Sequence, residues 1–207
     1  MAVREQLTKI VSFPAPPARR LLLMAPLSRS GHEQVDQLQA TLGSRLGAEN
    51  LWLPQGEQRH ITVGFVELVD PSADPEEQGG QLKTVTAKII PALGNVASRR
   101  LPLFSALTTI KPSLEAVIAQ SPPTGNDVVP LRLQAQTAIG QFSDCALLTK
   151  PSVHTTFVRF QSALPFSEVE AAVSGLAGFR EVTTGLVLAE TLHHYCDFEP
   201  VAAFKTT

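Results

Sequence analysis

The chain has 207 residues, of which 43% are hydrophobic and 17% are charged, and its formal net charge is −2. This size and composition predict one compact domain, or two small lobes that share a core. The sequence has no basic tail or broad basic field, which argues against duplex DNA as a partner, and no apolar run reaches the roughly 18 residues of a membrane span.

The first half of the chain predicts alternating strands and helices. Prolines in FPAPPA, at the end of residues 1–18, exclude a helix and predict an extended N-terminal extension. The apolar run at 19–27 predicts a buried strand, and residues 30–47 carry apolar side chains at helical spacing before a terminal glycine. Residues 60–69 are rich in β-branched side chains and predict a strand. Residues 70–93 begin with acidic residues and prolines, as helices commonly do.

The second half of the chain predicts a similar succession. Its expected elements are two strands around a Lys-Pro-Ser turn, a helix, a strand, a short helix and one or two closing strands, at residues 100–110, 114–120, 128–142, 152–160, 165–179 and 181–204. Each half therefore has the pattern strand–helix–strand, sometimes extended, which suggests an internal duplication of architecture. An α+β or α/β sheet with helices packed against it is the expected class.

Two of the predicted strands each contain a histidine followed two residues later by a threonine. These are His60 with Thr62 in RHITVGF, and His154 with Thr156 in VHTTFVRF. Side chains at positions i and i+2 point to the same face of a strand, so each histidine should project together with its threonine.

The neighbours of the first pair predict which face is buried. In a regular strand Ile61, Val63 and Phe65 point away from His60, and three bulky apolar side chains predict that this opposite face is the core. Gly64 continues the His60 face, where its lack of a side chain is expected to leave room for a ligand.

Imidazole and hydroxyl groups in this arrangement have a specific chemical use. Imidazole exchanges protons near neutral pH, and a hydroxyl can donate a hydrogen bond to an anionic oxygen. One pair is weak evidence, because a histidine on a strand is more often a hydrogen-bonded core residue. Two pairs in corresponding halves predict in-line displacement at phosphorus, in which one imidazole activates the nucleophile and the other protonates the leaving oxygen. The two hydroxyls would hold the non-bridging oxygens.

These motifs resemble the two-histidine (2H) phosphoesterase superfamily, in particular its branch of RNA 2′,3′-cyclic phosphodiesterases and 2′-5′ RNA ligases. The family pattern is His-Φ-Thr/Ser-Φ, with Φ apolar, occurring twice. HITV at 60–63 fits at every position, whereas HTTF at 154–157 has Thr155 at an apolar position. The resemblance extends from about Arg19 to Phe204 and includes the Trp- and Pro-containing segment before the first motif.

The resemblance implies a fold and a set of roles. It implies a single bilobal domain over residues 19–207 with a pseudo-twofold axis, in which two antiparallel or mixed sheets flank a central cleft and helices lie outside. His60 and Thr62 would form one half of the catalytic site, and His154 and Thr156 the other. No metal and no cofactor would be required, and the assignment of acid and base to the two histidines stays open.

Two further residues are candidates for substrate binding. Many members of the family carry an Arg or Lys shortly after the second motif, where this chain has Arg159. In a regular strand, however, Arg159 points away from His154, and Val158 shares the His154 face. A bulge in the strand or a surface role for Arg159 are the alternatives to phosphate binding. Tyr195 could stack a base or sugar at the rim of the cleft, or belong to the core.

Other aromatic and basic residues are interpreted as structural. Trp52 is expected to pack under the first motif, with base stacking as the alternative. The Arg19–Arg20 pair is interpreted as a solvated strand edge. Adjacent histidines in HHYCDF, at 193–198, point to opposite faces of a strand and therefore predict no metal site.

Cysteine content and the N-terminus bear on the compartment. Cys145 and Cys196 form no CxxC pattern, which favours free thiols in a reducing environment. The N-terminal stretch lacks the apolar region of a signal peptide. We therefore expect a cytoplasmic, monomeric protein without a membrane anchor.

The resulting hypothesis is a metal-independent phosphodiesterase that opens a 2′,3′-cyclic phosphate to a 2′-phosphate, with 2′-5′ RNA ligation as the possible reverse reaction. Its partner would be a small phosphorylated nucleotide or an RNA terminus. The alternative is a nucleotide- or RNA-binding module of the same fold without turnover, for which the unusual Thr155 is the only support.

Overall fold

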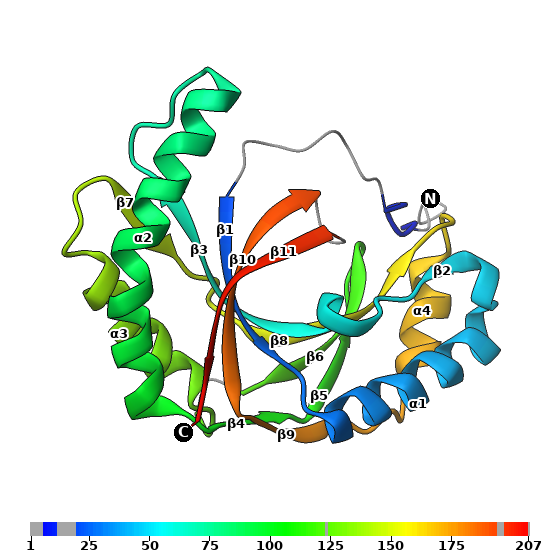
Figure 1. The fold of residues 1–207 in the computed structure, drawn as a ribbon. Helices are drawn as coiled ribbons and strands as arrows, with labels where there is room; N and C mark the ends of the chain where they lie inside the picture. Colours follow the sequence, from blue (N-terminus) through cyan, green and yellow to red (C-terminus); the bar gives the residue numbers. More distant parts are fainter. Residues whose placement is uncertain (1–5, 12–19, 123, 194–196, 207) are drawn as a thin grey trace.

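The computed structural model describes residues 6–11, 20–122, 124–193 and 197–206, and it confirms the α+β class (Figure 1). The helices are α1 (Arg29–Leu46), α2 (Pro75–Arg100), α3 (Val128–Ile139) and α4 (Phe166–Val173), with short 3-10 turns η1 (Ala48–Asn50) and η2 (Gly56–Gln58). The strands are β1 (Arg20–Pro26), β2 (Leu51–Trp52), β3 (His60–Leu68), β4 (Leu103–Leu107), β5 (Thr109–Pro112), β6 (Ala116–Ser121), β7 (Cys145–Leu148), β8 (Val153–Phe160), β9 (Phe179–Thr183), β10 (Gly185–His193) and β11 (Asp197–Lys205).

Nine of these strands form one antiparallel sheet that consists of two halves. The order is β11-β10-β1-β3-β8-β6-β5, with β7 paired to β3 and β2 paired to β8. The two halves meet between β3 and β8, where the only residue pair in register among the described residues is Ile61 with Thr155. The remaining strands, β4 and β9, form a separate antiparallel ribbon.

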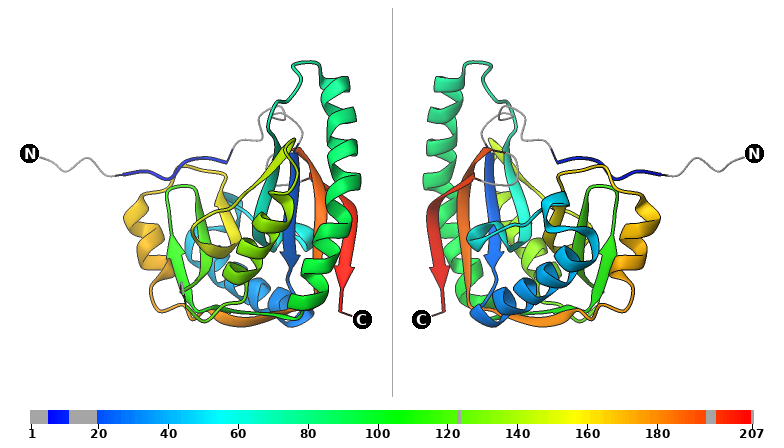
Figure 2. Two further views of the ribbon diagram at one scale, coloured as in Figure 1. Left: turned by 90° about the vertical axis from the view of Figure 1, so that its left-hand side faces the viewer. Right: turned by 90° about the vertical axis from the view of Figure 1, so that its right-hand side faces the viewer.

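The helices lie outside the sheet, two with each half. In Figure 1, α2 and α3 pack together on one side and α1 and α4 on the other, with the strands between them. The last strand, β11, runs alongside α2 (Figure 2). Within the part of the chain that the structure describes, no helix is long and apolar enough to cross a membrane.

Local sequence explains where the two long helices begin. Ser28 caps α1 by accepting a hydrogen bond from the Gly31 amide, and Asp74 caps α2 by accepting from the two amides that follow Pro75. The buried stripe of α1 contains the predicted apolar positions Val35, Leu38, Leu42 and Leu46. Helix α2 continues to Arg100, seven residues beyond the predicted end, with Pro91 inside it.

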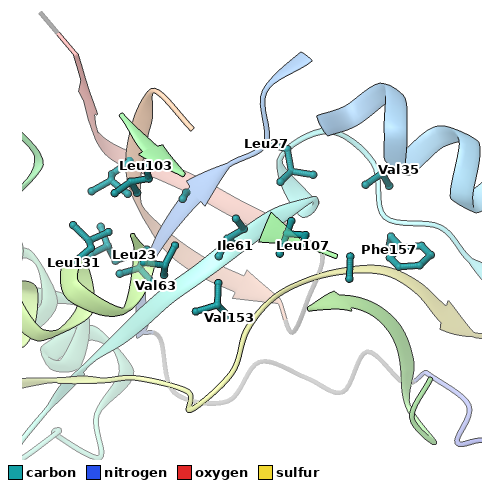
Figure 3. Packing of buried hydrophobic residues seen from close by; sticks show 14 of the residues in the cluster. Leu23, Leu27, Val35, Ile61, Val63, Leu103, Leu107, Leu131, Val153 and Phe157 are labelled. Carbon is teal, nitrogen blue, oxygen red and sulfur yellow. The ribbon is translucent and has the colours of Figure 1, made fainter. Parts of the chain in front are cut away.

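A continuous hydrophobic core fills the space between the sheet and the helices of both halves. Leu23, Ile61 and Val63 contribute from the first half, and Val153 and Phe157 from the second (Figure 3). Because this core covers one face of β3 and β8, the histidines of both strands are directed to the opposite face.

The segment from Gln6 to Val11 is hydrogen-bonded to the second half of the molecule. Thr8 is buried, its amide donates to the carbonyl of Leu164, and the Val11 amide donates to the carbonyl of Phe160. This part of the predicted extension therefore packs against β8 and the start of α4.

Candidate active site

Both His-x-Thr motifs lie at the junction of the two half-sheets. Ile61 and Thr155, the middle residues of the motifs, pair across β3 and β8 and are each 0% exposed on the core face. Their neighbours along each strand must point to the other face. His60, Thr62, His154 and Thr156 accordingly line a single pocket. Two motifs that are far apart in sequence thus converge at one place.

A β-bulge follows the threonine of the first motif. The register of β3 with β1 passes from Met24–Thr62 to Leu23–Gly64, which leaves Val63 as the extra residue. A bulge reverses the alternation of side chains beyond it. Phe65 therefore joins His60 and Thr62 in lining the pocket, and the prediction that Phe65 points into the core was wrong.

A matching bulge follows the threonine of the second motif. The register of β8 with β6 passes from Thr156–Ile118 to Val158–Val117, with Phe157 as the extra residue. Arg159 consequently lines the pocket, whereas Val158 is 0% exposed in the core. The regular-strand prediction was wrong for both residues, because a bulge, one of the alternatives for Arg159, precedes it in β8.

The role of Gly64 also differs from the expectation. A Cβ atom at this position would lie 2.8 Å from Leu147 Cδ1 and 2.8 Å from the carbonyl oxygen of Leu148, both in β7. Glycine here permits the close approach of β7, so the room it creates is occupied by protein and not left for a ligand.

Hydrogen bonds at Nδ1 orient the two imidazoles. Nδ1 of His60 lies 3.0 Å from the carbonyl oxygen of Glu57, and Nδ1 of His154 lies 3.0 Å from Ser152 Oγ. Since the carbonyl of Glu57 can only accept, Nδ1 of His60 carries the proton and Nε2 of the neutral ring keeps its lone pair. The rings of Phe198 and His60 pack in a T-shaped arrangement with their centroids 5.2 Å apart.

The environment of both imidazoles favours their neutral form. Burial lowers the pKa of His60 to about 4, and the charge of Lys150 acts in the same direction. Burial likewise lowers the pKa of His154 to about 4, assisted by Lys150, Arg132 and His60. Both rings are therefore neutral at pH 7 in the empty pocket, and a bound anion would raise both pKa values.

The pocket is lined by cations. Arg20, Lys150 and Arg159 line it together with the two histidines, and none of the described lining residues is acidic. In a chain of net charge −2, this is a local concentration of positive charge suited to an anionic ligand. Burial and the charges of Arg159 and Arg132 lower the pKa of Lys150.

Arg132 connects the two motifs from behind the pocket. It projects from α3, is 4% exposed, and donates to four main-chain carbonyls. Two belong to Thr62 and Val63, at 2.6 and 2.9 Å, and two to Lys150 and Ser152, at 2.7 and 3.1 Å. One buried guanidinium thus fixes the bulge of β3 relative to the segment that leads into β8.

Several residues around the pocket were missed or assigned differently from sequence. Lys150 and Phe65 were not predicted there, and Arg20 was interpreted as a solvated strand edge, whereas all three line the pocket. Trp52 also lines the pocket, on β2, where it pairs with Arg159. Tyr195 lies outside the described residues.

No group of three His, Cys, Asp or Glu side chains arranged to hold a metal occurs among the residues with described positions.

The two half-sheets, with a His-x-Thr couple contributed by each, define the two-histidine phosphoesterase fold. Among solved structures, one described only as a phosphoesterase is 17% identical to this chain, with a TM-score of 0.57 over 92% of this chain and 99% of that chain. Escherichia coli LigT, crystallised with 3′-AMP, is 18% identical, with a TM-score of 0.53 over 92% and 99% of the two chains. TT0787 of Thermus thermophilus is 13% identical, with a TM-score of 0.53 over 90% and 97%.

These likenesses concern the fold, because the sequences have diverged far. No protein-family model matches the chain, and no curated protein matches it by sequence. The residues of the pocket themselves must therefore carry the argument about function.

Proposed function

We propose that this protein is a metal-independent phosphodiesterase that hydrolyses a 2′,3′-cyclic phosphate to a 2′-phosphate. The observation that carries the proposal is the convergence of His60, Thr62, His154 and Thr156 on one face of one cation-lined pocket. Two imidazoles on either side of a phosphorus atom provide the base and the acid that in-line displacement needs.

Each group in the pocket has a defined part in this reaction. One imidazole takes a proton from water as the water oxygen bonds to phosphorus. The other imidazole, protonated, gives its proton to the 3′ oxygen as the bond from that oxygen to phosphorus breaks. The hydroxyls of Thr62 and Thr156 donate to the non-bridging oxygens, and Arg159 balances their charge. The product keeps its phosphate on the 2′ oxygen.

A 2′-5′ ligation by transesterification is compatible with the same geometry. If a 5′-hydroxyl replaces water as the nucleophile, the same base and acid open the cyclic phosphate and form a 2′-5′ linkage. Complexes of E. coli LigT, which shares this fold, with 3′-AMP, NADP+ and ATP support a nucleotide as the ligand of the pocket.

The alternative of a binding module without turnover loses its support in the structure. Thr155, the one departure from the motif, lies on the core face, and its hydroxyl has no hydrogen-bond partner among the described residues. It does not line the pocket, so its side chain leaves the polar groups of the motifs unchanged.

The test is hydrolysis of adenosine 2′,3′-cyclic monophosphate in the presence of a chelator, with identification of the product. We expect the wild type to release adenosine 2′-monophosphate, and His60→Ala and His154→Ala each to lower kcat by about 10²-fold or more. His32→Ala, outside the pocket, is the matched control and should retain activity. Full activity in both pocket variants would refute the proposal, and nucleotide binding without turnover would favour the binding module.

A further inference from the structure

We propose that the pocket contains a second phosphate subsite, formed by Arg20 and Lys150 beside Phe65, and that it selects substrates with a phosphate additional to the one being cleaved. The inference rests on the proposed function, because it concerns the same pocket. The roles described above leave these two cations without a part in the chemical step.

The two cations come from distant parts of the chain and meet at one aromatic ring. Arg20 Cζ, at the start of β1, lies 5.6 Å from the centroid of the Phe65 ring. Lys150 Nζ, from the segment before β8, lies 5.9 Å from the same centroid. Both distances are within the range of cation–π attraction. Both cations therefore pack against Phe65 at the pocket wall.

The position of Phe65 relative to the motif sets the distance between the two subsites. The bulge at Val63 inserts one extra residue into β3. Phe65 is therefore the next side chain after Thr62 that points to the pocket face. Consecutive side chains on one face of a strand are about 7 Å apart. This spacing accommodates a ribose ring whose cyclic phosphate lies at the histidines and whose other phosphate lies at Arg20 and Lys150.

The charges around this part of the pocket favour an anion. Among the described residues, Arg20 forms an ion pair with Glu67 at 3.6 Å, in which both side chains are partly exposed. Burial and the charges of Arg159 and Arg132 lower the pKa of Lys150, and the opposing charge of Glu115 does not reverse this direction. An added phosphate would therefore offset the repulsion that Arg159 and Arg132 exert on Lys150.

Two kinds of substrate carry the required phosphate. In RNA ending in a cyclic phosphate, it is the phosphodiester on the 5′ side of the terminal nucleotide. In ADP-ribose 1″,2″-cyclic phosphate, it is the diphosphate. Adenosine 2′,3′-cyclic monophosphate has no second phosphate and serves as the reference compound.

The experiment compares kcat/KM for the reference, for a dinucleotide with a 2′,3′-cyclic end and for ADP-ribose 1″,2″-cyclic phosphate. We expect the wild type to prefer at least one of the latter two by about tenfold or more, as charge-assisted hydrogen bonds to a phosphate would give. This ratio should fall toward one in Arg20→Gln and in Lys150→Gln. Lys83→Gln, an exposed position on α2, is the charge-matched control and should keep the wild-type ratio.

The outcomes separate this inference from the proposed function. Hydrolysis of all three compounds with equal kcat/KM, or an unchanged ratio in both variants, overturns the subsite and leaves the proposed function standing. If no compound is hydrolysed, the proposed function fails. The subsite is then tested by calorimetry, which compares the affinities for adenosine 2′,5′-bisphosphate and adenosine 2′-monophosphate. Tighter binding of the bisphosphate that is lost in both variants supports it, and equal affinities overturn it.

Discussion

The imidazoles of His60 and His154 bind a proton less readily than free histidine does. Burial lowers both pKa values to about 4, from an ordinary value near 6.5. In-line catalysis needs one ring neutral and the other protonated, and in the empty pocket this state becomes more populated as the pH falls toward 4. The negative charge of a bound substrate stabilises the imidazolium and moves this state to higher pH.

This difference predicts the pH dependence of the reaction. The pH dependence of kcat/KM reports pKa values of the free enzyme, and that of kcat reports those of the substrate complex. We therefore expect kcat/KM to decline as the pH rises above about 4, and kcat to have its optimum at higher pH than kcat/KM. Steady-state kinetics at closely spaced pH values measure both. Profiles that are flat from pH 5 to 9 would contradict the paired-histidine mechanism.

The alternation of side chains along a strand correctly predicted which face the motif residues occupy, but it failed for the residues immediately after them. It correctly placed His60 with Thr62 and His154 with Thr156 because these pairs precede the bulges. It failed for Phe65 because the extra residue Val63 is defined by pairing with β1, a partner that lies some forty residues away in the chain. No sequence pattern indicated that Lys150 lies in the pocket, because its position depends on how the segment before β8 folds.

Among the elements, β3 depends on a glycine for its close contact with β7. Gly64→Ala would place a Cβ atom 2.8 Å from β7 backbone and side-chain atoms, and we expect it to lower the free energy of unfolding by about 1–3 kcal/mol. Gly80→Ala, in α2 with open space around it, is the matched control and should raise that free energy by about 0.5–1 kcal/mol. Chemical denaturation measures both, and equal stabilities of the two variants would disprove the packing role of Gly64.

Helix α3 contributes to the site through Arg132. Arg132→Lys keeps the charge but loses the planar guanidinium that reaches four carbonyls, so the two motifs should shift relative to each other. We expect kcat to fall by about tenfold or more, with a changed pH–rate profile, in a protein that circular dichroism shows to be folded.

The matched control for Arg132 is Arg45→Lys. Arg45 also donates to main-chain carbonyls, those of Ala172 and Ser174, but lies away from the pocket. Its replacement should leave kcat and the pH–rate profile unchanged. If Arg132→Lys had the kinetics of the wild type, a positioning role for Arg132 would be excluded.

Whether a segment forms a helix or a strand was predicted more successfully than which strands pair with one another. The apolar stripe of α1 and the identity of β3 and β8 as strands follow from local periodicity. The predicted strand at 100–110 is divided instead, because β4 pairs with β9 in the small ribbon while β5 pairs with β6 in the large sheet. Local sequence does not specify such a change of partner.

At the scale of the whole molecule, the fold brings two similar half-sites to a common boundary. Each half-sheet contributes one strand with a histidine, a threonine and a bulge directly after the threonine. The halves are joined in register through Ile61 and Thr155, while the core and Arg132 connect them behind the pocket. The pocket has two imidazoles because the two strands that carry a His-x-Thr motif meet at this boundary.

The central claim is that both couples act on one phosphorus atom, and a crystal structure with adenosine 2′-monophosphate tests it most directly. The account predicts a phosphate within about 2.7–3.2 Å of Nε2 of His60 and of His154, with the hydroxyls of Thr62 and Thr156 donating to its oxygens. A phosphate bound by one motif alone, or elsewhere on the protein, would contradict it.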